Sequence, residues 1–228
     1  FKDESWPVRD CACIACSHFV STFPEESKEV FGELKDLWFD HLSDNIQSVR
    51  EHSSQSIIEV LSKAEIFKTE LTEAIQKHVS DNLMLAKTQP ADSHKFSGLQ
   101  NETIFGVAKP NQAHENEDHS NNTMFSCGSL APKLKRGGGC MDHGFTKPKE
   151  PWEMTDGSIF ILRECSKIDF MHDLVIKNLE NLSNLCYIDT FKHSSTMREN
   201  LFKSLAKIIP QMGKKKFRGY VELFIDPA

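Results

Sequence analysis

A pattern that recurs about every 40 residues constrains this chain more than any other feature. Residues 8–20 (VRDCACIACSHFV) align without gaps with residues 49–61 (VREHSSQSIIEVL), which begin 41 positions later. A third copy covers residues 197–209 (MRENLFKSLAKII), and a weaker copy covers residues 162–168 (LRECSKI). A period of this length is typical of stacked helical repeats. We therefore expect a scaffold, in which single reactive residues are not the first place to look for function.

Residues 1–87 are expected to form helices joined by short turns. Pro7 suits the first turn of a helix, Pro24 ends that helix, and Asp44 is a candidate N-cap for the third helix. Apolar residues recur at the spacing of a helix face. The expected buried stripes are Val8, Ala12, Ala15, Cys16, Phe19 and Val20; Val30, Leu34, Leu37 and Trp38; Val49, Ile57, Ile58 and Leu61; and Ile66, Leu71, Ile75, Val79 and Leu83.

Helical periodicity resumes in residues 152–228. Thr155 or Asp156 is expected to cap a helix that runs through Cys165, and Gly213 marks a turn before the last helix. The apolar stripes of this part are Ile159, Ile161, Leu162 and Cys165; Phe170, Leu174, Ile176 and Leu179; Met197, Leu201, Leu205, Ile208 and Ile209; and Val221, Leu223 and Phe224. The chain is thus expected to be all-α.

Residues 88–151 separate the two helical parts and have a different composition. They contain five prolines, many polar residues and the run Gly137–Gly139, and their apolar residues follow no period. Such a segment buries too little apolar area to offset its backbone entropy, so we expect an irregular or disordered insertion. The predicted organisation is therefore residues 1–87, an insertion at 88–151, and residues 152–228.

This layout resembles the HEAT and armadillo repeat family. The residues that carry the resemblance are Trp6-Pro7-Val8-Arg9, Asp44 with Val49-Arg50, and Met197-Arg198-Glu199 through Ile209-Pro210. The resemblance implies an α-solenoid in which an aspartate before the second helix of a repeat and an arginine inside that helix form a ladder along the stack. The implied ladder residues are Asp3, Arg9, Asp44, Arg50 and Arg198, with Asp189 as a looser partner of Arg198.

Composition and charge narrow the class of function and the compartment. The net charge of −6 disfavours general binding to nucleic acid, and no apolar run approaches the roughly 18 residues that span a bilayer. Seven cysteines, three of them within residues 11–16, are interpreted as core packing in a reducing compartment. We expect a cytoplasmic protein, with the nucleus as an alternative. The first residue is Phe1 rather than methionine, and we expect a piece of a longer protein.

The insertion holds the residues that could carry metal chemistry. Cys140 and His143 have the close spacing of half a zinc site, and Cys127 lies upstream. The simpler interpretation is a polar loop that contains these residues by chance. No third group orients Cys140 and His143 as a nucleophile and base, so no catalytic residue and no cofactor is predicted.

The leading functional hypothesis is a non-enzymatic scaffold for protein–protein interaction. Lys214, Lys215, Lys216 and Arg218 concentrate positive charge in the predicted last turn of an acidic chain, where an acidic partner could bind. Together with Trp6, this cluster favours a narrower alternative, a tubulin-binding array of the TOG type. A metal-binding protein that uses Cys127, Cys140 and His143 is a second alternative.

Overall fold

The computed structural model describes residues 1–3, 5–91 and 149–225. The α-helices before the gap are α1 (Trp6–Thr22), α2 (Lys28–His41), α3 (Gln47–Lys63) and α4 (Lys68–Asn82). Those after it are α5 (Pro151–Cys165), α6 (His172–Lys177), α7 (Leu179–Leu185), α8 (Ser194–Met212), α9 (Lys214–Phe217) and α10 (Glu222–Ile225). The same described residues include four 3₁₀ turns: η1 (Glu65–Phe67), η2 (Leu85–Thr88), η7 (Asp169–Met171) and η8 (Arg218–Tyr220). The all-α prediction is confirmed for these residues, which include no strand.

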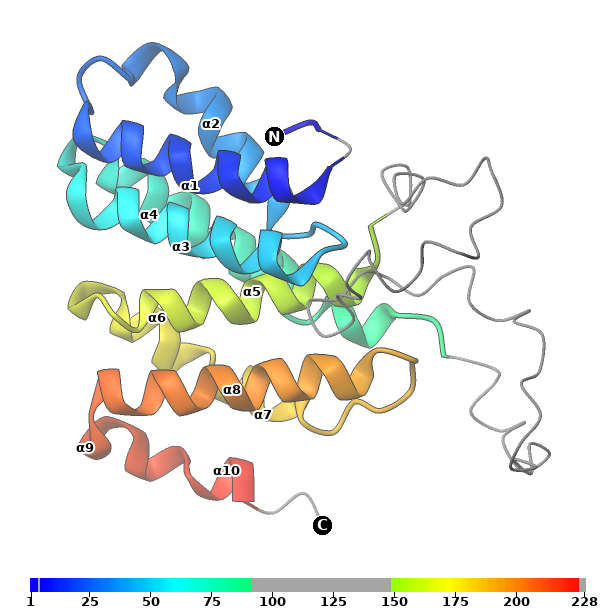
Figure 1. Cartoon of the computed structure of the whole chain (residues 1–228). Coiled ribbons are helices and arrows are strands. Elements are labelled where there is room, and N and C mark those ends of the chain that lie inside the picture. Colours follow the sequence, from blue (N-terminus) through cyan, green and yellow to red (C-terminus); the bar gives the residue numbers. More distant parts are fainter. Residues whose placement is uncertain (4, 92–148, 226–228) are drawn as a thin grey trace, which may run out of the picture.

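Helices α1, α3, α5 and α8 lie side by side and run in the same direction (Figure 1). Each packs on the next, while α2 packs on α3 and α4 packs on both α3 and α5. Their N-terminal ends therefore lie along one edge of the fold and their C-terminal ends along the opposite edge, on the left in Figure 1. One hydrophobic cluster extends from Cys13 in α1 to Phe217 in α9, so the two helical parts share a core.

Helix α5 is the centre of this core. It contacts α3, α4, α6, α8 and η2, and nearly all of its residues are buried. Gln89 and Glu150, at the two ends of the stretch that includes residues 92–148, are hydrogen bonded at 3.3 Å (Nε2 to Oε2). The chain therefore leaves and re-enters the described fold at one place.

The sequence placed the buried face of α1 incorrectly. Val20 of the expected stripe is buried, but Val8 and Phe19 are about half exposed. The other buried residues of α1 are Arg9, Cys13 and Ser17, which lie outside the expected stripe. Small side chains explain the difference, because they let α3 approach closely. Ser56 Oγ of α3 donates to the Cys13 carbonyl oxygen at 2.9 Å, and Ser17 Oγ donates to Glu59 Oε2 at 3.0 Å.

The buried stripes of α3 and α8 are largely as predicted. All four expected residues of α3 are buried, as are four of the five in α8: Val49, Ile57, Ile58, Leu61, Met197, Leu201, Leu205 and Ile208. Other expected positions differ, because Val30, Ile66 and Phe170 are nearly half exposed. The last two lie in the 3₁₀ turns η1 and η7. There the tighter winding of the chain changes which residues face the core.

Two predicted helix starts are wrong, and the predicted last helix is divided. Ile46 is the N-cap of α3, and Asp44 instead accepts the Ile46 amide proton through Oδ1 at 2.9 Å. Helix α5 begins at Pro151 behind a capping box formed by Glu150 and Glu153, so Thr155 and Asp156 are buried inside the helix. The expected last helix is divided into α9, η8 and α10.

Gly157 allows α5 to lie unusually close to the α2–α3 turn. A Cβ atom at this position would stand 1.8 Å from the carbonyl oxygen of Leu42. Only glycine fits without moving one of the two backbones. The close approach brings the middle of α5, including Asp156, against the start of α3.

Candidate functional site

The first pair of the ladder joins α1 to the turn before α3. Arg9 Nε donates to Asp44 Oδ2 at 2.9 Å, and one terminal guanidinium nitrogen donates to Asp44 Oδ1 at 3.0 Å. The other terminal nitrogen donates to the Asp3 carbonyl oxygen at 3.0 Å. Both side chains are less than a tenth exposed. This two-point geometry is the strongest form of an arginine–carboxylate pair.

The second pair, between α3 and α5, is similar, except that both guanidinium nitrogens bond to the same carboxylate oxygen. Arg50 Nε and one terminal nitrogen donate to Asp156 Oδ2 at 3.0 and 2.9 Å, and the other terminal nitrogen donates to the Asp44 carbonyl oxygen at 2.6 Å. Each arginine thus contacts the carbonyl of the aspartate six positions before it and the carboxylate of an aspartate further along the chain. Both members of this pair are fully buried.

Helix α8 completes the second pair. Asn200 Nδ2 donates to both carboxylate oxygens of Asp156, at 3.1 and 3.3 Å, and Gln47 Nε2 donates to Asn200 Oδ1 at 3.2 Å. The Arg50 guanidinium lies 5.1 Å from the centre of the Trp152 ring. The Trp152 ring stacks on the His193 ring, with 4.9 Å between the ring centres. Three helices from both sides of residues 92–148, namely α3, α5 and α8, therefore meet in one hydrogen-bonded network.

The predicted ladder differs from the observed one in its carboxylate partners. The sequence paired Asp44 with Arg50 and Asp3 with Arg9, but only the backbone oxygens of these aspartates make those contacts. The Asp3 carboxylate accepts the Ser5 amide at 2.8 Å. In α8 the residue bonded to Asp156 is Asn200 and not Arg198, which lies outside this network and is only half-buried.

The electrostatics of the second pair are those of a structural contact. Burial raises the pKa of the Asp156 carboxyl, and the charge of Arg50 together with the hydrogen bond from Asn200 counteracts that effect. The pair is sealed from solvent, and the arginine and the carboxylate neutralise each other. This arrangement fixes the relative positions of three helices.

A second buried ion cluster lies further along the same helices. Arg163 of α5 bonds to Glu51 of α3 at 2.9 Å and to its neighbour Glu164 at 2.8 Å. Its second terminal nitrogen is buried and has no hydrogen-bond partner among the described residues. The sequence suggested only that Arg163 begins a weak repeat, and nothing in the local pattern indicates that it contacts Glu51.

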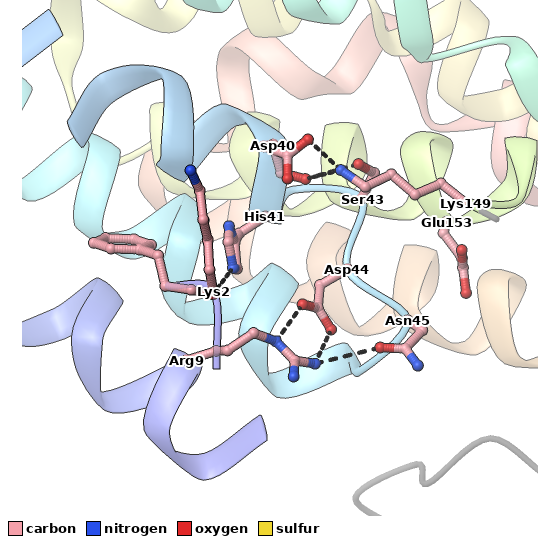
Figure 2. A pocket seen from close by; sticks show the side chains of 10 residues that line it. Lys2, Arg9, Asp40, His41, Ser43, Asp44, Asn45, Lys149 and Glu153 are labelled. Carbon is pink, nitrogen blue, oxygen red and sulfur yellow. Dashed lines mark hydrogen bonds and ion pairs between the residues drawn. The ribbon is translucent and has the colours of Figure 1, made fainter. Parts of the chain in front are cut away.

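A pocket of about 240 Å³, lined mainly by charged and polar residues, borders the first pair (Figure 2). It lies between the N-terminal parts of α1 and α5, the C-terminal end of α2 and the α2–α3 turn, and ten residues line it: Phe1, Lys2, Arg9, Asp40, His41, Ser43, Asp44, Asn45, Lys149 and Glu153. Charges in its wall bond to one another, as Lys149 does to Asp40 and Arg9 does to Asp44. The pocket is mixed in charge and offers no nucleophile paired with a base.

The predicted partner-binding residues lie on opposite edges of the fold. Trp6 begins α1 and is half-buried against the core, whereas the basic cluster lies in α9 and η8, after the C-terminal end of α8 (Figure 1). The cluster is not an open turn, because Lys214–Phe217 is a short helix. Lys215 and Arg218 are exposed, and Lys216 Nζ contacts His172 Nδ1 at 3.0 Å. A single binding edge therefore cannot contain both Trp6 and the basic cluster, the two features that favoured the TOG-type alternative.

The other two tryptophans and the described cysteines belong mainly to the core. Trp38 is fully buried and donates to the Cys13 carbonyl oxygen at 3.2 Å, and Trp152 is buried beside Arg50. Burial raises the pKa of the Cys13 thiol to about 12. Burial raises the pKa of Cys165 as well, so both thiols behave as small apolar groups.

The metal candidates Cys127, Cys140 and His143 lie outside the described residues. Within the part that the structure describes, no group of three or more His, Cys, Asp or Glu side chains is arranged to hold a metal ion. In the same part, no helix is long and apolar enough to cross a membrane. The cytoplasmic location stays a prediction.

Comparison with known proteins assigns no family to this fold. No family model, no curated protein and no solved structure matches the chain.

Proposed function

We propose that this chain is a non-enzymatic scaffold for protein–protein interaction, built from HEAT-like helical hairpins stacked into a short solenoid. The observation that carries the proposal is the repetition of one contact at a period of 41 residues. Arg9 and Arg50 each bind a backbone oxygen six positions earlier and a carboxylate of a following segment. Such a repeat places equivalent helices in equivalent environments, and the resulting long surfaces suit the binding of other proteins.

The basic cluster is the first candidate contact on this scaffold. Lys215 and Arg218 are exposed and oppose the net charge of −6 of the whole chain. An acidic protein surface would be attracted to them, and salt would weaken that attraction. Tubulin, with its acidic tails, is one acidic protein to test.

The test is affinity purification with the complete chain, compared with a double variant, Lys215→Glu with Arg218→Glu. Lys77→Glu with Lys87→Glu is the matched control, because both of these lysines are exposed and lie elsewhere, in α4 and η2. We expect a specific acidic protein to bind, to be lost in the first variant and in high salt, and to persist in the control. The absence of any protein that binds the folded chain specifically would contradict the scaffold.

A further inference from the structure

Four inter-helix connections, the last of which contains the short helix α9, form a continuous row along the edge that holds the C-terminal ends of α1, α3, α5 and α8 (Figure 1). We call this row the turn edge; it consists of residues 19–29, 64–68, 166–173 and 213–218. Side chains join successive turns. The ring of Phe31, which lies in α2 two residues beyond the first turn, stacks on the Phe67 ring with 3.6 Å between ring centres. Lys68 Nζ lies 4.7 Å from the Phe170 ring centre, and Lys216 contacts His172.

The first three turns each expose a large apolar side chain. Phe19 and Phe23 are nearly half exposed, and their ring centres lie 5.8 Å apart. Ile66 and Phe170 are exposed to a similar degree. Ile66 and Phe170 occupy the same position in two 3₁₀ turns, η1 and η7. In each turn the next residue is buried. The backbone of both turns therefore directs one apolar side chain outward.

Charge is divided along the same row. At its first end, Lys28 is bonded to Glu25, whereas the exposed carboxylates of Glu26 and Glu29 have no ionic partner among the described residues. At its last end, Lys215 and Arg218 are exposed cations. The turn edge thus has an acidic end and a basic end. Between them the apolar side chains of Ile66 and Phe170 are exposed beside the exposed charged side chains of Glu65, Lys167 and Asp169.

The charge order along the turn edge matches that of a second copy placed in the opposite direction. If a second copy is turned by 180° about an axis between η1 and η7, each acidic end faces a basic end and the apolar side chains meet in the middle. A two-fold interface requires a surface that matches itself in this way. Apolar contacts at the centre with charged contacts at the rim are the usual anatomy of such an interface.

We propose that the chain forms an antiparallel homodimer through the turn edge. The proposal rests on the scaffold function and identifies one acidic surface that meets Lys215 and Arg218 as the Glu26 and Glu29 region of a second copy. Its test uses the purified protein alone, so a monomeric result would remove the dimer and leave the search for another acidic partner intact.

The experiment is sedimentation velocity of the complete chain over a range of protein and salt concentrations. We expect a monomer of 26.0 kDa to convert to a dimer as concentration rises, and dimerisation to weaken with salt. Glu26→Lys with Glu29→Lys, and separately Lys215→Glu with Arg218→Glu, should each weaken the dimer at least tenfold. An equimolar mixture of the two variants should restore it, because both rim contacts are then attractive again.

Two further double variants test whether Ile66 and Phe170 promote dimerisation through their place in the turn edge or only because they are exposed and apolar. Ile66→Ser with Phe170→Ser should weaken the dimer, whereas Val8→Ser with Phe202→Ser should not, since these two residues are equally exposed but lie away from the turn edge. Circular dichroism checks that each variant is folded. A monomer at every concentration would overturn the proposal. A dimer whose affinity is unchanged by the charge-reversal variants would also overturn it. So would an equimolar mixture of the two charge-reversal variants that does not dimerise.

Discussion

The pairs Arg9–Asp44 and Arg50–Asp156 use the same chemistry in different surroundings. The first pair lies beside the pocket and retains slight exposure, whereas the second is fully buried between α3, α5 and α8. The difference follows from the elements that surround each pair. The first pair lies between α1 and the turn before α3 and borders the pocket, whereas the second pair is enclosed by α3, α5 and α8.

This comparison indicates that the loss of the same type of contact costs a different free energy at the two positions. Water in the pocket beside the first pair can partly solvate a group that has lost its partner, so breaking that pair should cost less. A dry pair contributes little net stability when intact, yet its loss is costly because one charge is left buried and uncompensated. The second pair should therefore determine whether the helices before and after residues 92–148 remain together.

The largest expected effect is at Gly157, which allows the close approach that the second pair requires. Gly157→Ala forces a methyl group against the Leu42 carbonyl oxygen, so we expect a loss of more than about 4 kcal/mol in the free energy of unfolding. Gly32→Ala is the control, because it also lies in a helix but has nothing within 4 Å of its added Cβ atom. It should stabilise the protein by about 0.5–1 kcal/mol. Equal effects of the two changes in urea unfolding would refute the close approach.

The next effect separates the two ion pairs directly. Asp156→Asn leaves Arg50 without its carboxylate in a dry site, and we expect a loss of about 3–4 kcal/mol. Asp44→Asn leaves Arg9 beside the pocket, where we expect a loss of about 1–2 kcal/mol. Chemical denaturation of both variants measures the difference. A larger loss for Asp44→Asn would reverse the assigned roles.

A smaller effect is expected when residues 92–148 are replaced by a short Gly-Ser linker. Gln89 and Glu150 are hydrogen bonded to each other, so a short connection can span the gap. The second pair joins the two parts without help from the replaced residues, and loop length changes closure entropy only slowly. We expect the free energy of unfolding to change by less than about 1 kcal/mol. A loss above about 2 kcal/mol would show that the replaced residues pack on the fold.

The smallest effect concerns a titratable contact next to the first pair. His52 Nδ1 lies 2.7 Å from Asp10 Oδ1, and this hydrogen bond raises the pKa of His52 above its usual value. The stabilisation is therefore complete below the unfolded-state pKa and is lost as pH rises through the folded-state pKa. We expect less than about 1 kcal/mol, because the pair is partly exposed. Asp10→Asn should remove this component of the pH dependence, and an unchanged profile would contradict it.

The sequence indicated the helices and most ladder residues, because these depend on local periodicity. The equal spacing of Asp3 to Arg9 and of Asp44 to Arg50 identified four of the residues that the structure brings together. The same spacing could not identify Asp156, which is 106 positions from Arg50 and was expected to cap a helix. An ion pair formed across so long a separation leaves no local pattern.

The buried face of α1 was misread for a different reason. Apolar residues occur on several sides of that helix, so hydrophobicity alone does not define its inner face. The observed face follows the small residues Cys13 and Ser17, which allow close contact with α3. Size complementarity between two helices depends on both partners and cannot be read from one.

Hydrogen exchange over a urea series tests the central claim most directly, namely that helices on both sides of residues 92–148 form one continuous stack. If α3 and α5 share a core joined by Arg50 and Asp156, then amides in α1, α3, α5 and α8 should lose protection together at one urea concentration. In Asp156→Asn the two parts should separate into two transitions. Separate transitions in the unmodified protein would contradict the account, because they would show two independent domains.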